Sequence, residues 1–286
     1  MSTFSSTDQL GGQTDHVDFV GVHLVLDCRT AGWSNLASVV EQVLRSWFMA
    51  RNAHARLFLS ADRPAREREI AFDLGSEKDI AEIAKQVLHR DVATVHARTH
   101  RGEWESTRKG HWLWWGLGNA LTRDSPNPAS SFVMTLPTSK FSGDESRGVV
   151  AIRETIIGID ARVPIVYGYA NRGRWNRFPR GGLDPVYAET ARSIPVSNFD
   201  VPGTTEYARY RRGVKGAFWV NVLNPDHVRS LGGLEGLAAR VKPHRIEQLP
   251  SGNFVVLVTP SPMVEDTPEN REAFRRLFEA TKPIWA

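Results

Sequence analysis

The sequence predicts an α+β protein made of two related strand–helix lobes, with mostly antiparallel strands and helices packed on them. Apolar residues recur at helical spacing in several segments, and short runs rich in valine, isoleucine and leucine lie between those segments. Pairs such as Asn224-Pro225 and the turn residues at 250–253 mark helix starts and a hairpin. We expect a flexible tail at 1–16 and one domain at 17–286, with lobes at about 17–125 and 126–286.

The first lobe is predicted to run β-α-β-β-α-β, which is the element order of a ferredoxin-like unit. Its strands are expected at 17–28, 56–60, 70–74 and 92–98. A helix at about 35–51 follows from apolar residues spaced three and four apart, with Ser34 or Asn35 as its N-cap. A second helix opens at Ser76, because Asp79 three residues later completes a capping-box pattern.

The second lobe follows a tryptophan-rich stretch at 99–128, which we interpret as an irregular connection. Strands are expected at 131–136, 165–170 and 217–223, and a helix with Val149, Ile152 and Ile156 on its buried face lies between the first two. Further helices are predicted to start at Asp184-Pro185, Asn224-Pro225 and Thr267-Pro268. The lobe is completed by three further elements. These are a helix ending at Gly232-Gly233, a short helix to about 240, and a hairpin in which 245–249 pairs with 254–258.

The composition is typical of a soluble globular protein. The 286 residues are 41% hydrophobic, and the longest apolar runs are strand-sized, far below the about 20 residues of a membrane-spanning helix. One cysteine, Cys28, allows neither an intrachain disulfide nor a Cys-x-x-Cys pair, so a reducing compartment fits best. We therefore expect a cytoplasmic protein.

The formal net charge of +4 is unevenly distributed. Residues 1–143 are neutral, with 16 basic and 16 acidic side chains, whereas 162–215 carries ten basic and four acidic ones, a local charge of +6. Within this stretch, arginine alternates with aromatic residues over 167–180. This chemistry serves protein–protein hot spots and single-stranded nucleic acid equally, and a solvated loop is the simpler alternative. The candidate partner-binding residues are Arg172, Arg174, Trp175, Arg177 and Tyr187.

Patterns that carry catalytic chemistry are not found. The sequence has no phosphate-binding loop, no His-Glu-x-x-His zinc helix and no Gly-x-Ser-x-Gly nucleophile elbow. Cys28 ends an apolar strand, where a buried and inert thiol is usual. We therefore expect no enzyme, no catalytic residue, no metal and no cofactor.

The C-terminal half resembles a known family. The residues that carry the resemblance are Gly213, Val214, Lys215, Gly216, Ala217, Phe218, Trp219, Leu223, Val228, Leu231, Gly232, Gly233 and Leu234. This block is similar to that of the bacterial type VI secretion immunity family associated with VRR-Nuc nuclease effectors. Gly252, the apolar run 255–258, Pro260 and Pro262 follow in the family's order. The resemblance covers about 130–286, and 17–100 by element order alone.

The resemblance implies an immunity protein of bacterial competition that binds a cognate type VI toxin and occludes its active site. Most of the shared residues also have structural explanations. Gly213, Gly216, Gly232 and Gly233 fit turns and caps, Trp219 fits the core, and Lys215 belongs to the same block. The alternative is a nucleic-acid-binding protein that uses the Arg/aromatic stretch. Of the two, the toxin is the partner we expect.

Overall fold

The computed structural model describes residues 17–27, 31–49, 54–59, 69–89, 92–98, 112–116, 129–138, 141, 145–175, 182–183, 210–265 and 267–284. The elements in chain order are β1 (Val17–Asp27), α1 (Trp33–Trp47), β2 (His54–Leu59), β3 (Glu69–Asp73), α2 (Glu77–Leu88), β4 (Val92–Arg98), β5 (Trp112–Gly116), β6 (Ala129–Pro137), α3 (Glu145–Asp160), β7 (Ile165–Trp175), β8 (Gly182–Leu183), β9 (Val220–Leu223), α6 (Pro225–Ser230), α7 (Gly233–Val241), β10 (Arg245–Gln248), β11 (Phe254–Leu257), α8 (Pro268–Thr281) and the 3-10 helix η4 (Lys282–Ile284).

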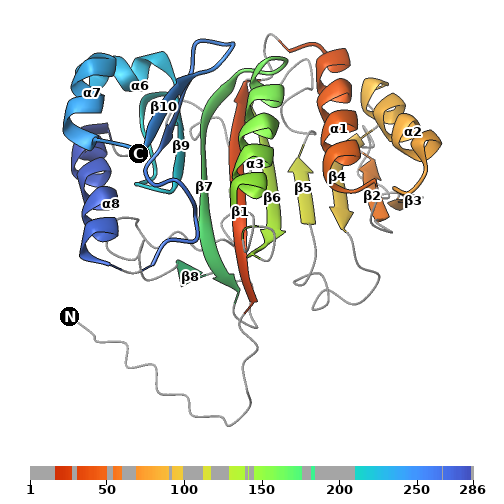
Figure 1. The fold of residues 1–286 in the computed structure, drawn as a ribbon. Coiled ribbons are helices and arrows are strands. Elements are labelled where there is room, and N and C mark those ends of the chain that lie inside the picture. Colours follow the sequence, from red (N-terminus) through yellow and green to blue (C-terminus); the bar gives the residue numbers. More distant parts are fainter. Residues whose placement is uncertain are drawn as a thin grey trace, which may run out of the picture.

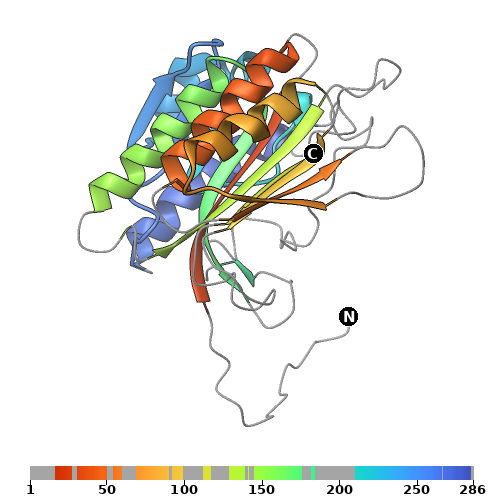
Figure 2. The same cartoon turned by 90° about the vertical axis from the view of Figure 1, so that its right-hand side faces the viewer.

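These strands form one sheet in the order β10-β11-β9-β7-β1-β6-β5-β4-β2-β3, with β8 beside β7 (Figure 1). Every ladder between them is antiparallel. Helices α1, α2 and α3 lie together on one side of this sheet (Figure 2). The predicted α+β class with mostly antiparallel strands is therefore confirmed.

Strand pairing in the first half is not ferredoxin-like, although the predicted element order is present. β1 lies between β6 and β7, away from β2, β3 and β4. The reason is burial on both faces: Val20 and Leu24 are fully buried on one face, and Phe19 and Val25 are 5% and 2% exposed on the other. A strand of this kind needs a central place in a covered sheet, which two long neighbours provide.

Helix starts follow the sequence prediction with one exception. The Ser76 hydroxyl accepts from the Asp79 N–H at 3.4 Å, and Asn224 accepts from the His227 N–H at 2.9 Å. The N-cap of α1 is Gly32, not Ser34 or Asn35, and it makes no side-chain cap. The helix holds without one because its apolar stripe is buried. That stripe consists of Leu36, Ala37, Val39, Val40, Val43, Leu44 and Trp47.

Two strands go beyond the sequence prediction. β5 lies inside the connection expected to be irregular at 99–128, and β7, expected to end at 170, continues to Trp175 within the Arg/aromatic stretch 167–180. In both cases, pairing with a distant strand supplies the backbone partners: β5 pairs with β4 and β6, and β7 pairs with β1 over its whole length. The helix predicted at Asp184-Pro185 falls outside the described residues.

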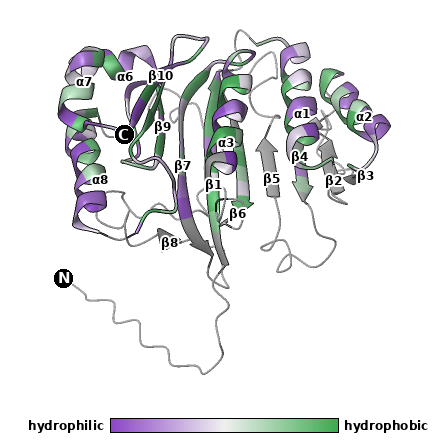
Figure 3. Ribbon diagram, viewed as in Figure 1, coloured by the Kyte–Doolittle hydropathy of each residue, from purple (hydrophilic) through white to green (hydrophobic). Residues whose placement is uncertain are grey.

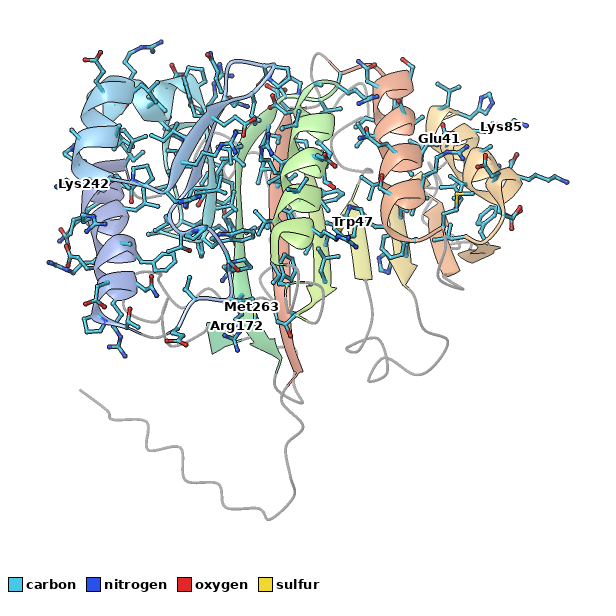
Figure 4. All side chains as sticks on the ribbon, viewed as in Figure 1. Glu41, Trp47, Lys85, Arg172, Lys242 and Met263 are labelled. Atoms are coloured by element: carbon cyan, nitrogen blue, oxygen red, sulfur yellow. The ribbon has the colours of Figure 1, made fainter. Side chains whose placement is uncertain are left out.

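One hydrophobic cluster forms the core. It contains buried residues of α1, α2 and α3, of α7 and α8, and of the segment 210–219. Figure 3 shows that β1, β6 and β9 are mostly hydrophobic, whereas β7 turns hydrophilic toward its end. Trp47 of α1 reaches α3, where its Nε1–H donates to the Thr155 hydroxyl at 2.8 Å (Figure 4). Arg153 of α3 pairs with Glu247 of β10 at 2.6 Å. Polar contacts thus fix α3 to α1 and to the sheet edge.

A buried carboxylate joins the end of α3 to the turn between β10 and β11. Asp160 is 2% exposed and accepts from the Ser251 N–H at 3.0 Å, the Ser251 hydroxyl at 2.8 Å and the Asn253 amide at 3.0 Å. It also accepts from the Ile165 N–H at 3.3 Å, at the start of β7. One side chain therefore holds the β10–β11 turn against the junction of α3 and β7, which lies 91 to 93 residues earlier in the sequence.

Trp219 fills the core as predicted. It is fully buried, its Nε1–H donates to the Thr259 carbonyl at 3.0 Å, and its ring meets Phe141 edge-on with centroids 6.4 Å apart. The side chain thus connects the segment before β9 to that after β11.

Gly168 of β7 is required by close packing against β1. A Cβ built there would lie 2.5 Å from Leu24 Cδ2 and 3.1 Å from the His23 carbonyl oxygen. We expect Gly168→Ala to lower the free energy of unfolding by about 1–3 kcal/mol through overpacking. Gly236→Ala is the matched control in urea denaturation, because Gly236 lies in α7 with its nearest contact at 3.5 Å. Equal stability of the two variants would contradict the packing argument.

Candidate functional site

A cluster of histidine and tyrosine side chains lies on the sheet face opposite α3. Val220 of β9 packs against α3 and pairs with Ala170 of β7. Because side chains alternate along a strand, Tyr169 next to Ala170 projects from the opposite face. His23 of β1 pairs with Tyr169 and therefore shares that face. The helix-covered face is apolar, whereas this face is polar and aromatic.

His23, Tyr169 and Phe218 make the first half of the cluster. The Nδ1 atom of His23 lies 3.2 Å from the Tyr169 hydroxyl. The rings of Tyr169 and Phe218 stack with centroids 4.1 Å apart and an interplanar angle of 18°. This arrangement places the segment before β9 against the two central strands.

Lys215 contacts both tyrosines, Tyr167 and Tyr210, in the second half of the cluster. Its backbone N–H donates to the Tyr167 hydroxyl at 3.1 Å, and its ammonium lies 4.8 Å from the centroid of the Tyr210 ring. Tyr167 and Tyr210 stack at 5.9 Å, and His227 of α6 meets Tyr167 edge-on at 6.1 Å. The family-like block thus packs through Lys215 onto β7.

Burial keeps the two histidines and Tyr167 of this cluster neutral at pH 7. Burial and the nearby Lys215 charge lower the pKa of His23 to about 3, and burial lowers the pKa of His227 to about 4. Burial also raises the pKa of Tyr167 well above its usual value. A general base works best with a pKa near the operating pH, and these shifts move all three groups away from it. These three side chains are therefore suited to packing and hydrogen bonding within the fold, and not to acid–base catalysis at neutral pH.

The two lowered pKa values predict a pH-dependent stability. The unfolded histidines take up protons near pH 6.5, but the folded ones stay neutral down to about 3 and 4, so stability is full above pH 6.5 and falls below it. Between about pH 7 and about pH 5.5, the loss should be about 1 kcal/mol for each histidine. Urea denaturation of His23→Gln should show a shallower loss than the wild type. His244→Gln, at an exposed position, is the control, and parallel curves for all three proteins would contradict the assignment.

The five candidate partner-binding residues are only partly covered by the structure. Arg172 lies half-buried in β7 and appears at the lower end of that strand in Figure 4. Arg174 and Trp175 are the last but one and the last residues of β7, and their side chains lie outside the described part. Arg177 and Tyr187 are outside the described residues altogether. Whether the five form one surface stays a prediction.

Two of the family-like glycines have a backbone conformation that favours glycine. Gly232 and Gly233 have φ values of +86° and +78°, which favour glycine at the junction of α6 and α7. Gly213 and Gly216 are buried in the segment that leads to β9. The backbone at Gly213 is hydrogen-bonded to His227, a contact that sequence spacing does not reveal.

The part of the chain that the structure describes contains neither a candidate metal centre nor a candidate membrane span. No group of three or more histidine, cysteine, aspartate or glutamate side chains there could hold a metal ion. No helix among them has the length and hydropathy needed to cross a membrane.

Comparison with solved structures shows that the fold recurs in a T6SS protein of Pseudomonas aeruginosa. The two structures superpose with a TM-score of 0.62 at 11% sequence identity, over 94% of this chain and 77% of that one. A comparison with curated proteins finds no match. At this identity the superposition establishes a shared fold.

Residues 63–286 match the family TsiV, described as type VI immunity for VRR-NUC. The match covers most of the chain and contains the whole block around Lys215 and Trp219, so the resemblance inferred from that block is confirmed. The chain therefore belongs to the TsiV family of type VI immunity proteins for VRR-NUC.

Proposed function

We propose that this protein binds a cognate type VI effector, a nuclease of the VRR-Nuc type, in the cytoplasm and neutralises it by covering the nuclease active site. The observation that carries the proposal is the family match over residues 63–286. Neutralisation by binding needs a surface that is formed before the partner arrives, because ordering a surface on binding costs affinity. A single sheet with one continuous core is such a scaffold.

The chemistry of the described residues supports binding rather than catalysis. His23, His227 and Tyr167 are neutral at pH 7 and are engaged in packing and capping. A stable complex of standard size would bury about 1,600 Å² in total, or more.

Inhibition by purified proteins tests this proposal. A VRR-Nuc effector is titrated with the protein, and nuclease activity should fall linearly to zero at one equivalent. Co-expression should also restore growth to cells that make the effector. A type VI effector without a VRR-Nuc domain is the control and should stay active. If the protein neither forms a complex with VRR-Nuc effectors nor protects cells from them, the proposal is wrong.

We also propose that Arg172, Arg174, Trp175, Arg177 and Tyr187 contact the effector. Arg174→Ala with Arg177→Ala should then weaken effector binding. The same variants distinguish the alternative of nucleic-acid binding. Steeply salt-dependent binding to oligonucleotides that these substitutions abolish would favour that alternative.

A further inference from the structure

A cavity of about 240 Å³, called the end cavity below, lies where β1 ends, β7 begins and α6 starts. Sites for drug-sized molecules usually measure about 300–1,000 Å³, so the end cavity is suited to one inserted side chain. It lies at the opposite end of β7 from Arg174 and Trp175. At about 3.3 Å per residue, the two ends are about 33 Å apart.

Two other cavities are less suited to a partner. One of about 290 Å³ lies between α7 and α8, where Arg275 pairs with Glu272 and Arg276 donates to the Val241 carbonyl. Its lining carries three arginines and two glutamates, so its net charge is positive and does not favour a basic side chain. Another, of about 10 Å³, is enclosed by α3, β9 and β11 and has room for no more than one water molecule.

The floor of the end cavity is an irregularity in the central ladder. Val25 pairs with Tyr167 but Leu26 pairs with Ile165, which leaves Val166 as an extra residue on β7. A bulge of this kind interrupts the ladder and frees backbone groups for other partners. The carbonyls of 165 and 166 therefore face side chains from other elements.

Two buried asparagines use these carbonyls and hold the walls in place. Asn224, the N-cap of α6, donates to the Val166 carbonyl at 3.0 Å, and Asn253 of the β10–β11 turn donates to the Ile165 carbonyl at 2.6 Å. Their exposed fractions are 9% and 4%. The Asn253 amide also donates to the Asp160 carboxylate, which holds the asparagine in this position. The cavity is therefore rigid before any partner arrives.

The lining combines an apolar wall with carboxylates. Pro164, Ile165 and Pro225 provide apolar surface, and Asp27 and Asp226 provide two negative charges. The stem of a lysine or arginine packs on apolar surface while its charged head seeks polar partners, which matches this lining.

The positive charges near the cavity do not block a cation. Arg211 also lines it and is exposed, as Asp226 is, so solvent screens both charges alike; the lining keeps two carboxylates against one guanidinium. Arg229 pairs with Asp226 at 2.7 Å, with side chains 77% and 53% exposed. Exposed pairs of this kind contribute little, so a partner's cation can replace Arg229 on Asp226.

We propose that the end cavity receives a lysine or arginine side chain of the effector, an inference that rests on the proposed function. Nucleases act on a polyanion and carry basic side chains on the surface that faces it. A carboxylate-lined cavity on an inhibitor is complementary to such a surface. It provides a second contact, separate from the Arg/aromatic residues at the far end of β7.

Affinity measurements on charge variants of the full chain test the proposal. The partner is a catalytically inactivated VRR-Nuc effector, with titration calorimetry at low and high salt. Asp226→Asn and Asp27→Asn should each weaken binding by about 10-fold or more, since truncating one member of a close charge pair at an interface has effects of this size. Arg211→Gln should leave the affinity unchanged or improve it. Glu235→Gln in α7, an exposed carboxylate away from the cavity, is the control.

The outcomes separate the two proposals. If the wild type does not bind the effector, the proposed function is wrong and the cavity contact fails with it. If the wild type binds and Asp226→Asn binds equally well, the function stands and the cavity contact is overturned. Weaker binding by Arg211→Gln alone would mean that the cavity takes an anion and would also overturn it. Asp226 is half-exposed, so its variant keeps the test valid even if Asp27→Asn does not fold.

Discussion

Replacing Asp160 with alanine should lower the free energy of unfolding by about 3–5 kcal/mol, because hydrogen bonds to a carboxylate contribute about 1.5–3 kcal/mol each and bonds that share one acceptor do not add fully. The substitution takes away four hydrogen bonds, and it leaves one amide N–H of the buried Asn253 and the buried Ile165 N–H without this acceptor. It also releases the β10–β11 turn from α3. Urea denaturation monitored by tryptophan fluorescence measures the loss.

Glu154→Ala is the matched control for Asp160→Ala. Glu154 is an exposed carboxylate on the same helix, so its removal should change stability by less than about 0.5 kcal/mol. Asp160→Asn retains the shape but exchanges one acceptor for a donor, so its loss should fall between those two. A loss below about 1 kcal/mol for Asp160→Ala would contradict the role given to this network.

Trp219→Ala is the second substitution with a large expected effect, about 3–5 kcal/mol of unfolding free energy. The indole is fully buried and contacts Phe141, so its removal leaves a cavity that the surrounding side chains fill only in part. The Thr259 carbonyl also loses its donor. Thermal and urea denaturation should agree on the loss.

Trp219→Phe separates packing from hydrogen bonding. The phenyl ring keeps most of the volume but has no N–H, so this variant should lose about 1–3 kcal/mol, the cost of an unpaired buried carbonyl together with a small void. If both variants were as stable as the wild type, Trp219 would not be part of the core that the structure describes.

Sequence patterns predict those parts of this fold that depend on neighbouring residues. The stripe from Leu36 to Trp47 repeats within one helix, and the caps at Ser76, Asn224 and Thr267 need only the next turn. Such elements are decided over distances of three to eight residues, and the structure confirms them.

Pairing between distant segments is what the sequence could not predict. β1 pairs with β6 and β7, which follow it by more than a hundred residues, and Asp160 meets Asn253, which lies 93 residues further along the chain. The same applies to the candidate site. The family-like block in the sequence includes Lys215. No pattern of neighbouring residues, however, predicts the contact of Tyr167 with Lys215 or that of His23 with Tyr169.

The central place of β1 has a consequence for how a newly made chain folds. Residue 27 ends β1, but its second neighbour, β7, is complete only at residue 175. At synthesis rates of about 5–20 residues per second, β1 waits about 7–30 s for both partners. The centre of the sheet can therefore close only after residue 175 has been made, and until then at least one edge of β1 lacks its partner strand.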